Sequence, residues 1–277
     1  MRQMFTVALL ELRLGIRSRW VLLSTLTLLF FAVLLVFLGA SPTTGLDADP
    51  ITLLVASLAT LSVYLLPLIA LLLSFDSIAG EVDRGTLQLL LATPIRRSEL
   101  LLGKFLGHVS VLAIAVGVGY GLAGGLALAQ AEGSVTATSI TGLLRLIGSS
   151  VLMGAAFVAL GLLLSALARQ TATAAAMAIL TWLLCVVLYD LALLGGLVLA
   201  PDGFFAQTLM PYFLLINPAD AFRVFNMALL DLGAASTGLV GTEDVLPFPA
   251  AAALASPVLA TLLVLALCIV RFKRIQP

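Results

Sequence analysis

Charged residues are scarce in this chain. They make up 10% of its 277 residues, whereas 62% are hydrophobic and the mean hydropathy is +1.20. This balance excludes a soluble globular protein, because a water-exposed surface requires more charge. The formal net charge is zero, so the overall charge gives no indication of nucleic-acid binding, and we expect no nucleic-acid partner.

Histidine and cysteine are almost absent. His108 is the only histidine, which excludes a multi-histidine metal site within one subunit. Cys185 and Cys268 both lie in apolar runs and predict neither a disulfide nor a redox compartment. Methionine and cysteine, which are soft ligands for Cu(I), are scattered without helical pairing, and Met210 and Met227 are the better candidates among them. We therefore predict no metal site.

Catalytic motifs are missing as well. The sequence around Lys104 lacks both the first glycine and the hydroxyl residue of a P-loop, so the chain cannot hydrolyse a nucleotide by such a loop of its own. A serine–histidine protease would need Ser149 or Ser150 beside His108, but their predicted depths in the membrane differ. Asp190 has no evident partner, which favours an interfacial position over a proton relay. We expect no catalytic residue.

Long apolar runs dominate what is present. Six reach the roughly 20 residues that a helix needs to cross a bilayer, at about 21–39, 51–75, 105–129, 143–167, 172–199 and 249–270. They are continuous rather than alternating, which argues against a β-barrel. We predict an all-α, polytopic membrane protein with one membrane domain over 1–277. The first run is too long for the core of a signal peptide, and the fifth is long enough to tilt or break.

Basic residues are distributed unevenly between the loops. With the N-terminus inside, the cytosolic segments hold 12 of the 14 basic residues, namely Arg2, Arg13, Arg17, Arg19, Arg84, Arg96, Arg97, Lys104, Arg169, Arg271, Lys273 and Arg274. Only Arg145 and Arg223 fall elsewhere. The positive-inside rule therefore predicts cytoplasmic N- and C-termini and an even number of spans.

Two segments outside the spans have amphipathic patterns. Residues 1–20 place apolar residues at three- and four-residue steps between arginines, which indicates a helix on the inner membrane surface; a basic flank that only orients the first span is the alternative. The long outer loop, 200–248, predicts two short helices, Phe204–Met210 and Ala219–Asp231, separated by Pro211 and Asn217-Pro218. A loop this apolar either re-enters the membrane or is covered by another protein.

The cytosolic segment 76–104 interrupts the apolar sequence with charge. Its pattern predicts that span two breaks near Gly80, that a short helix follows over Thr86–Ala92, and that this helix stops before Pro94. Ser98, with Glu99 in the first turn, suits the start of span three. The short helix carries four leucines, which predict a groove to receive them: Leu87, Leu89, Leu90 and Leu91. An ordinary connector with topogenic charges is the alternative.

This segment resembles the signature of ABC-2-type transporter permeases. The matching residues are Glu81, Gly85-Thr86, Leu89-Leu90, Pro94-Ile95, Arg97 and Gly103-Lys104. The resemblance extends over the whole chain and implies a coupling helix seated on a separate ATP-binding subunit, a homodimer of permeases on two ATPases, and ATP and Mg bound by the ATPase rather than here. By the pattern and the resemblance, the expected ATPase-coupling residues are Glu81, Asp83, Arg84, Gly85, Thr86, Leu87, Leu89, Leu90, Pro94, Arg96 and Arg97.

Within that family the chain is similar to the permeases of nitrous-oxide-reductase maturation transporters, in its N-terminal LLELRLGIRSRW, its central segment and its Ile216–Asp220 stretch. The resemblance implies a bacterial inner-membrane protein with a cytosolic ATPase dimer, a periplasmic β-helical protein, a second copy of itself and the lipid membrane as partners, serving copper-site maturation. The outer residues expected to dock the periplasmic partner are Tyr212, Asn217, Pro218, Asp220 and Arg223. An exporter of lipid, drug or a sulfur species, and a non-transport scaffold, are the alternatives.

Overall fold

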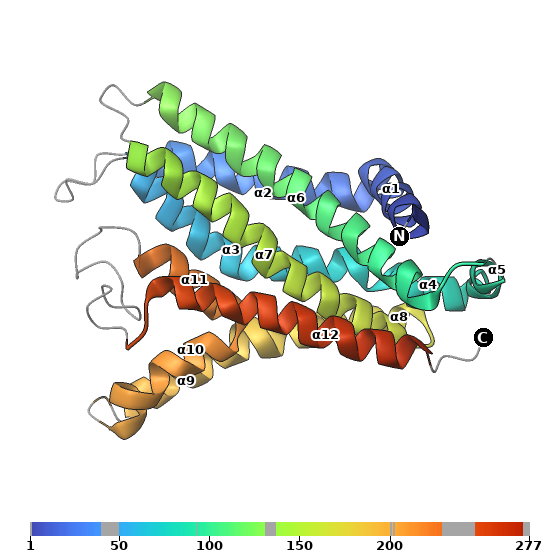
Figure 1. Ribbon diagram of the computed structural model, residues 1–277. Helices are drawn as coiled ribbons and strands as arrows, with labels where there is room; N and C mark the ends of the chain where they lie inside the picture. The colour runs from blue at the N-terminus through green and yellow to red at the C-terminus, as the bar shows by residue number, and fades with distance from the viewer. Residues whose placement is uncertain are drawn as a thin grey trace.

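The computed structural model describes residues 2–39, 50–92, 94–130, 137–199, 201, 203–228 and 247–273, and within these the regular elements are all helical (Figure 1). Among the described residues, six helical segments are long and apolar enough to cross a membrane: Val21–Leu38, Ile51–Asp83, Arg97–Gln130, Ile140–Leu167, Thr171–Leu199 and Ala250–Lys273. The predicted all-α fold and its six spans are confirmed. The span boundaries differ from those of the apolar runs by one to eight residues at one end or both, since polar residues at a helix end cost little at the membrane surface.

The fourth span, α7 (Ala137–Leu167), lies at the centre of the bundle. It packs against α3 (Pro50–Ser74), α6 (Arg97–Gln130) and α12 (Ala255–Lys273). The first span, α2 (Arg19–Gly39), packs mainly on α6. Small residues allow these close approaches: a side chain at Gly154 would collide with Leu112, and one at Gly161 would collide with Ser74. Gly154 and Gly161 thus serve close contacts between helices of one subunit.

The N-terminal helix α1 (Arg2–Arg17) is a separate element that turns sharply away from α2 and packs on α6 (Figure 1). Gly103 of α6 admits it closely, since a Cβ there would lie 2.8 Å from the carbonyl of Met4. Its apolar residues Phe5, Leu9 and Ile16 remain exposed at 62%, 49% and 55%. Such a face is suited to lipid, and the location of α1 on the membrane surface stays a prediction.

The second span is interrupted earlier than the sequence predicts. α3 ends at Ser74 and α4 (Asp76–Asp83) begins after Phe75, so the expected break near Gly80 is wrong: Gly80 is buried inside α4. The reason is a distant residue. Ser165 Oγ of α7 accepts the backbone N–H groups of Ile78 and Ala79 at 2.9 and 2.8 Å, and so stabilises the start of a new helix at this point.

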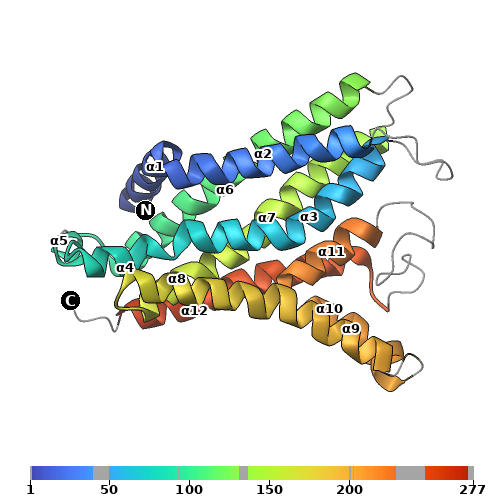
Figure 2. The ribbon, with the colours of Figure 1, turned by 180° about the vertical axis from the view of Figure 1, so that it is seen from behind.

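The fifth span contains a π-helical segment, η1 (Leu183–Leu188), between α8 (Thr171–Trp182) and α9 (Tyr189–Leu199). Beyond it, α9 diverges from the bundle, and α10 (Met210–Ile216) returns beside it (Figures 1 and 2). The expected irregularity of this span is therefore present, as a π-helix rather than as a chain break.

The outer loop then re-enters the bundle as α11 (Pro218–Ala228), which packs against α3, α7 and α12. Pro211 does not end a helix here as predicted, because it occupies the first turn of α10, where its missing N–H is tolerated. Asn217 is extended and separates α10 from α11, as expected from Asn217-Pro218. The part of the predicted second helix beyond Ala228 lies outside the described residues.

Candidate functional site

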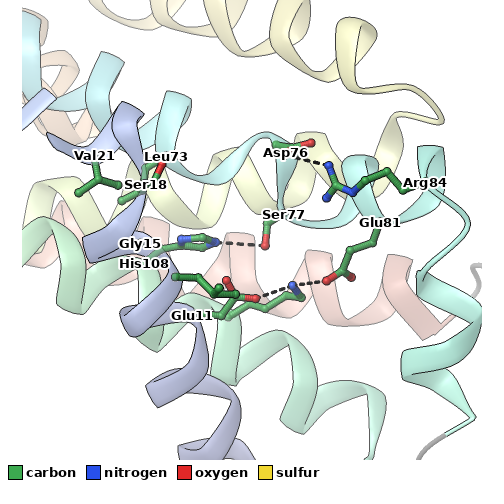
Figure 3. Close-up of a pocket in the computed structure, with 12 residues that line it drawn as sticks. Glu11, Gly15, Ser18, Val21, Leu73, Asp76, Ser77, Glu81, Arg84 and His108 are labelled. Carbon is green, nitrogen blue, oxygen red and sulfur yellow. Dashed lines mark hydrogen bonds and ion pairs between the residues drawn. The ribbon is translucent and has the colours of Figure 1, made fainter. Parts of the chain in front are cut away.

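A buried ion cluster lies where α1, α4 and α6 meet. Lys104 of α6 is 3% exposed, and its Nζ donates to Glu11 Oε1 of α1 at 2.6 Å and to Glu81 Oε1 of α4 at 2.7 Å. Figure 3 shows Glu11 and Glu81 approaching each other from their two helices. A buried ammonium needs such partners, since an unpaired charge is strongly destabilising. The cluster therefore holds three elements in one arrangement.

Two further contacts fix α4 to its neighbours. Ser77 Oγ is 3.1 Å from Nε2 of His108 in α6, and Thr171 at the start of α8 donates its backbone N–H to Asp83 Oδ2 at 3.3 Å and its hydroxyl to Asp76 at 3.3 Å. Together with the Ser165 contact, these bonds connect α4 to α6, α7 and α8. A displacement of α4 must therefore be transmitted to several spans.

The tip of the segment is the short helix α5 (Leu87–Leu91), one residue shorter at each end than predicted. Gly85, with a φ of +69°, ends α4, and the N–H of Thr86 then donates to the carbonyl of Glu81 at 2.9 Å. A positive φ favours glycine because it has no Cβ. The turn therefore directs α5 away from the bundle end (Figure 1).

The leucines of α5 do not share one environment. Leu87 is 2% exposed and belongs to the main core, Leu90 is half-buried, and Leu89 is 71% exposed. The expectation that several leucines seek an external groove thus applies to Leu89 above all. Arg84, Pro94 and Arg96 are exposed as well, and the Arg84 guanidinium lies 3.6 Å from the carboxylate of Asp76.

Arg97 has a role within the chain that the sequence does not reveal. It opens α6, and its Nη1 donates to the carbonyls of Phe272 at 3.2 Å and Lys273 at 3.0 Å, at the C-terminal end of α12. A guanidinium suits this position because the last carbonyls of a helix have no partner in the helix and carry partial negative charge. ATPase contact by Arg97 stays a prediction, but this hydrogen bonding competes with it.

A second polar cluster lies where α3, α9 and α11 meet. Arg223 of α11 donates to Asp190 of α9, with Nη2 at 2.5 Å and Nη1 at 3.3 Å, and also to Asp220. Tyr64 of α3 donates its hydroxyl to the same Asp190 at 3.1 Å. The expectation that Asp190 lacks a partner is therefore wrong, because Arg223 follows it by 33 residues and only the fold brings the two together.

Asn217 belongs to the same region. Its Nδ2 donates to the Cys185 carbonyl of η1 at 2.6 Å and to Asp220 Oδ2 at 2.9 Å, while its Oδ1 accepts the N–H of Ala219 at 3.1 Å. A π-helix leaves carbonyls without their usual i+4 donor, so the side chain of Asn217 stabilises the irregular turn. Burial raises the pKa of the Asp220 carboxyl to about 6, and Arg223 opposes the rise.

The five outer residues predicted to dock a partner are placed unequally. Asn217 and Asp220 are 6% and 2% exposed, Arg223 is half-buried in the ion cluster, and Pro218 is the half-buried first residue of α11. Tyr212 is 51% exposed. Asn217, Asp220 and Arg223 take part in holding α11 against η1 and α9, while direct docking remains a prediction that suits Tyr212.

Neither a protease dyad nor a metal cluster is assembled by the described residues. His108 contacts Ser77, whereas Ser149 is bonded to Asn226, whose Nδ2 donates to the serine Oγ at 3.0 Å. No group of three or more His, Cys, Asp or Glu side chains comes together in this part of the chain.

Comparison with known proteins agrees with this architecture. The family model for ABC-2 family transporter proteins matches residues 5–276. The chain belongs to the ABC-2 family. Two curated ABC-2 relatives are each named probable ABC transporter permease protein NosY. The Pseudomonas aeruginosa protein is 41% identical over 249 residues, 90% of both chains, and the Stutzerimonas stutzeri protein is 39% identical over 251 residues, 91% of both chains. The resemblance inferred from the Glu81–Lys104 pattern is confirmed, and this ABC-2 chain is a NosY-like permease subunit.

The side chains that pair with Lys104 are harder to predict from the sequence. The sequence pattern places Lys104 in the family motif, but it does not indicate that Lys104 is a buried ammonium. It also does not single out Glu11 as its partner. One signal existed in the sequence: Glu11 is an acid in an otherwise basic and apolar helix, and Lys104 adjoins a long apolar run. Charges in such places require partners.

Proposed function

We propose that this permease couples ATP hydrolysis by a separate cytosolic ATPase dimer, NosF-like, to mechanical work on a periplasmic β-helical protein, NosD-like, in copper-site maturation of nitrous oxide reductase. Two copies of the chain would form the membrane part, in the bacterial inner membrane with both termini cytoplasmic. ATP and Mg would be bound by the ATPase. The observation that carries the proposal is one continuous helix, α3, which joins the coupling segment to the outer ion cluster.

The structure of the end that carries α5 supports docking of the ATPase there. Leu89 offers an exposed apolar side chain at the tip of α5, with Arg84 and Arg96 exposed nearby. An exposed apolar side chain on a short helix is suited to insertion into a hydrophobic groove of a partner. The Lys104 cluster then ties α4 to α1 and α6, so that movement of the tip is shared rather than absorbed locally.

The span α3 supports transmission. α4 follows α3 directly after Phe75, and Tyr64 of α3 both donates to Asp190 and accepts the indole N–H of Trp182 through its carbonyl at 2.9 Å. A shift of α3 thus reaches α8 and α9 by hydrogen bonds. Coupling between distant sites requires an element with two discrete arrangements, and η1, stabilised by Asn217, is suited to be that element.

The structure of α9 and α10 supports mechanical action on the periplasmic partner. α9 and α10 project from the bundle, and their pairing is held by Tyr189, which donates to the Phe213 carbonyl at 2.7 Å. Tyr212 is exposed on this arm. An arm that leaves the bundle beyond a π-helix would move farther than the helix that drives it, which fits mechanical work on an external partner.

Replacing Leu89 by Asp tests the input. A carboxylate at this position would have to be desolvated in an apolar groove, which costs several kcal/mol, so we expect at least a ~100-fold loss of affinity for the co-expressed NosF-like ATPase. Leu89→Met, which keeps the side chain apolar, is the matched control. Co-purification and binding titration measure the effect. An unchanged complex with Leu89→Asp would favour the scaffold alternative.

The nature of the work needs a separate experiment. The complete complex is reconstituted in vesicles, and copper uptake is followed with and without ATP. We expect ATP hydrolysis without ATP-dependent copper movement. ATP-driven accumulation of copper in the vesicles would refute mechanical transmission and would leave the permease role intact. The exporter alternative predicts ATP-dependent movement of a lipid, drug or sulfur species in the same vesicles.

A further inference from the structure

Two cavities beside α1 share a wall. The first has a volume of about 280 Å³ and a wall that is about half polar; its lining includes Glu11, Ser77, Glu81, Arg84, Lys104 and His108 (Figure 3). The second has a volume of about 530 Å³ and is mainly apolar; its lining includes Ile69, Leu72, Val111, Leu112, Ala115 and Ala175. Ser18, Val21, Leu73 and Asp76 line both. The two are therefore adjoining cavities, referred to together below as the cleft, with a charged half and a hydrocarbon-like half.

The apolar half lies among α2, α3, α6 and α8, and it is accessible from outside the chain, because Leu72 in its wall is 37% exposed. Its volume is within the roughly 300–1,000 Å³ of sites that bind small organic molecules. A cleft that opens between membrane-spanning helices faces lipid, and an apolar chain is the occupant that such a wall favours.

The charged half indicates which headgroup fits. Of the described residues that line it, three carry carboxylates and two carry cations, so a further negative charge is disfavoured. Lys104 is already bound to two carboxylates. Glu81 Oε2 is buried and has no hydrogen-bond partner among the described residues. A buried acceptor without a donor is costly, and a wall with three carboxylates favours a ligand ammonium, which has three N–H groups to donate.

We propose that this cleft binds one phospholipid with a primary-amine headgroup, phosphatidylethanolamine in chemical class. Its acyl chain occupies the apolar half, its phosphate faces Arg84, and its ammonium faces Glu81 and Asp76. The lipid would then lie against α1, α3 and α4 and fill space beside the coupling segment. The inference is independent of the proposed ATPase coupling, since it concerns a ligand of this chain alone.

The test is lipid binding to the delipidated full chain in detergent, followed by native mass spectrometry. Phosphatidylethanolamine, phosphatidylcholine and phosphatidylglycerol with identical acyl chains are titrated. We expect one tightly held phosphatidylethanolamine, with at least about fivefold weaker binding of the other two, a difference of about 1 kcal/mol. Phosphatidylcholine lacks N–H donors, and phosphatidylglycerol lacks the positive charge.

Two variants locate the site. Ala175→Trp fills the apolar half and should abolish the tightly held lipid, whereas Ala176→Trp, at the exposed neighbouring position outside the cleft, should retain it. Asp76→Asn removes one carboxylate and should narrow the difference between phosphatidylethanolamine and phosphatidylglycerol. Thermal unfolding of each variant verifies that it is folded.

Three outcomes would overturn the proposal. The first is equal binding of the three lipids, and the second is unchanged binding by a folded Ala175→Trp variant. The third is efficient disulfide formation between two copies of a Leu72→Cys variant in native membranes, with Cys185 and Cys268 replaced by Ser, because this would show that a second copy of the chain occupies the cleft.

Discussion

Replacing Lys104 by Met is expected to lower the free energy of unfolding by about 3–5 kcal/mol, the range for removing one partner of a buried ion pair. Glu11 and Glu81 would remain opposite each other, with side chains only 16% and 14% exposed. Unfolding in mixed micelles of mild detergent and dodecyl sulfate measures the loss. Arg13→Met, which removes an exposed cation of α1, should change the free energy by less than about 0.5 kcal/mol.

The triple variant Lys104→Met, Glu11→Gln, Glu81→Gln distinguishes stability from coupling. Neutral residues of similar volume often replace a buried ion cluster without loss of stability, so most of the stability should return. Under the proposed function, the folded triple variant should still bind the ATPase through α5, but the ATPase should no longer respond to the permease. A single Lys104→Met variant as stable as the unmodified chain would show that the cluster is not buried in the native protein.

Replacing Arg223 by Met is the second change with a large expected effect. It leaves Asp190 and Asp220 close together without a cation, and we expect a loss of about 3–5 kcal/mol in the free energy of unfolding. The exchange Asp190→Arg with Arg223→Asp should recover part of the loss, because Arg at 190 would face Asp at both 220 and 223. The same mixed-micelle unfolding measures both variants.

The functional prediction for the exchanged variant is specific to the outer end. Under the proposed function, the exchanged variant should bind the ATPase and leave its ATP hydrolysis unchanged, while the ATP-dependent conformational change at the proposed periplasmic partner is reduced, as measured by distances between spin labels on α10 and that partner. If Arg223→Met and the exchanged variant both retained full stability and full response, the cluster would have no part in joining α9 to α11.

Features that depend on neighbouring residues were predictable from the sequence. The spans are recognisable because each is a continuous apolar run, and the end of α5 is predictable because Pro94 follows it. The amphipathic character of residues 2–17 was also visible, because its repeat is local. These are properties of a chain segment alone, before any packing.

Contacts between distant residues were not predictable. The interruption of span two depends on Ser165, which lies 87 positions after Ile78, and nothing in 76–83 indicates it. Asp190 has no evident partner in the sequence because the cation that binds it, Arg223, lies on α11. Glu81 was recognised through a family motif, but its relation to Glu11 depends on α1 folding back over α6. Such pairs are decided by tertiary packing, which one sequence does not reveal.

The bond from Arg97 to the end of α12 has a consequence for biosynthesis. Arg97 is synthesised well before Phe272 and Lys273, yet the carbonyls of these two residues are its acceptors. This contact therefore forms only after the sixth span has been inserted. Until then the start of α6 lacks these two hydrogen bonds, so a stalled or truncated chain differs from a finished one beside the segment that the proposed ATPase would contact.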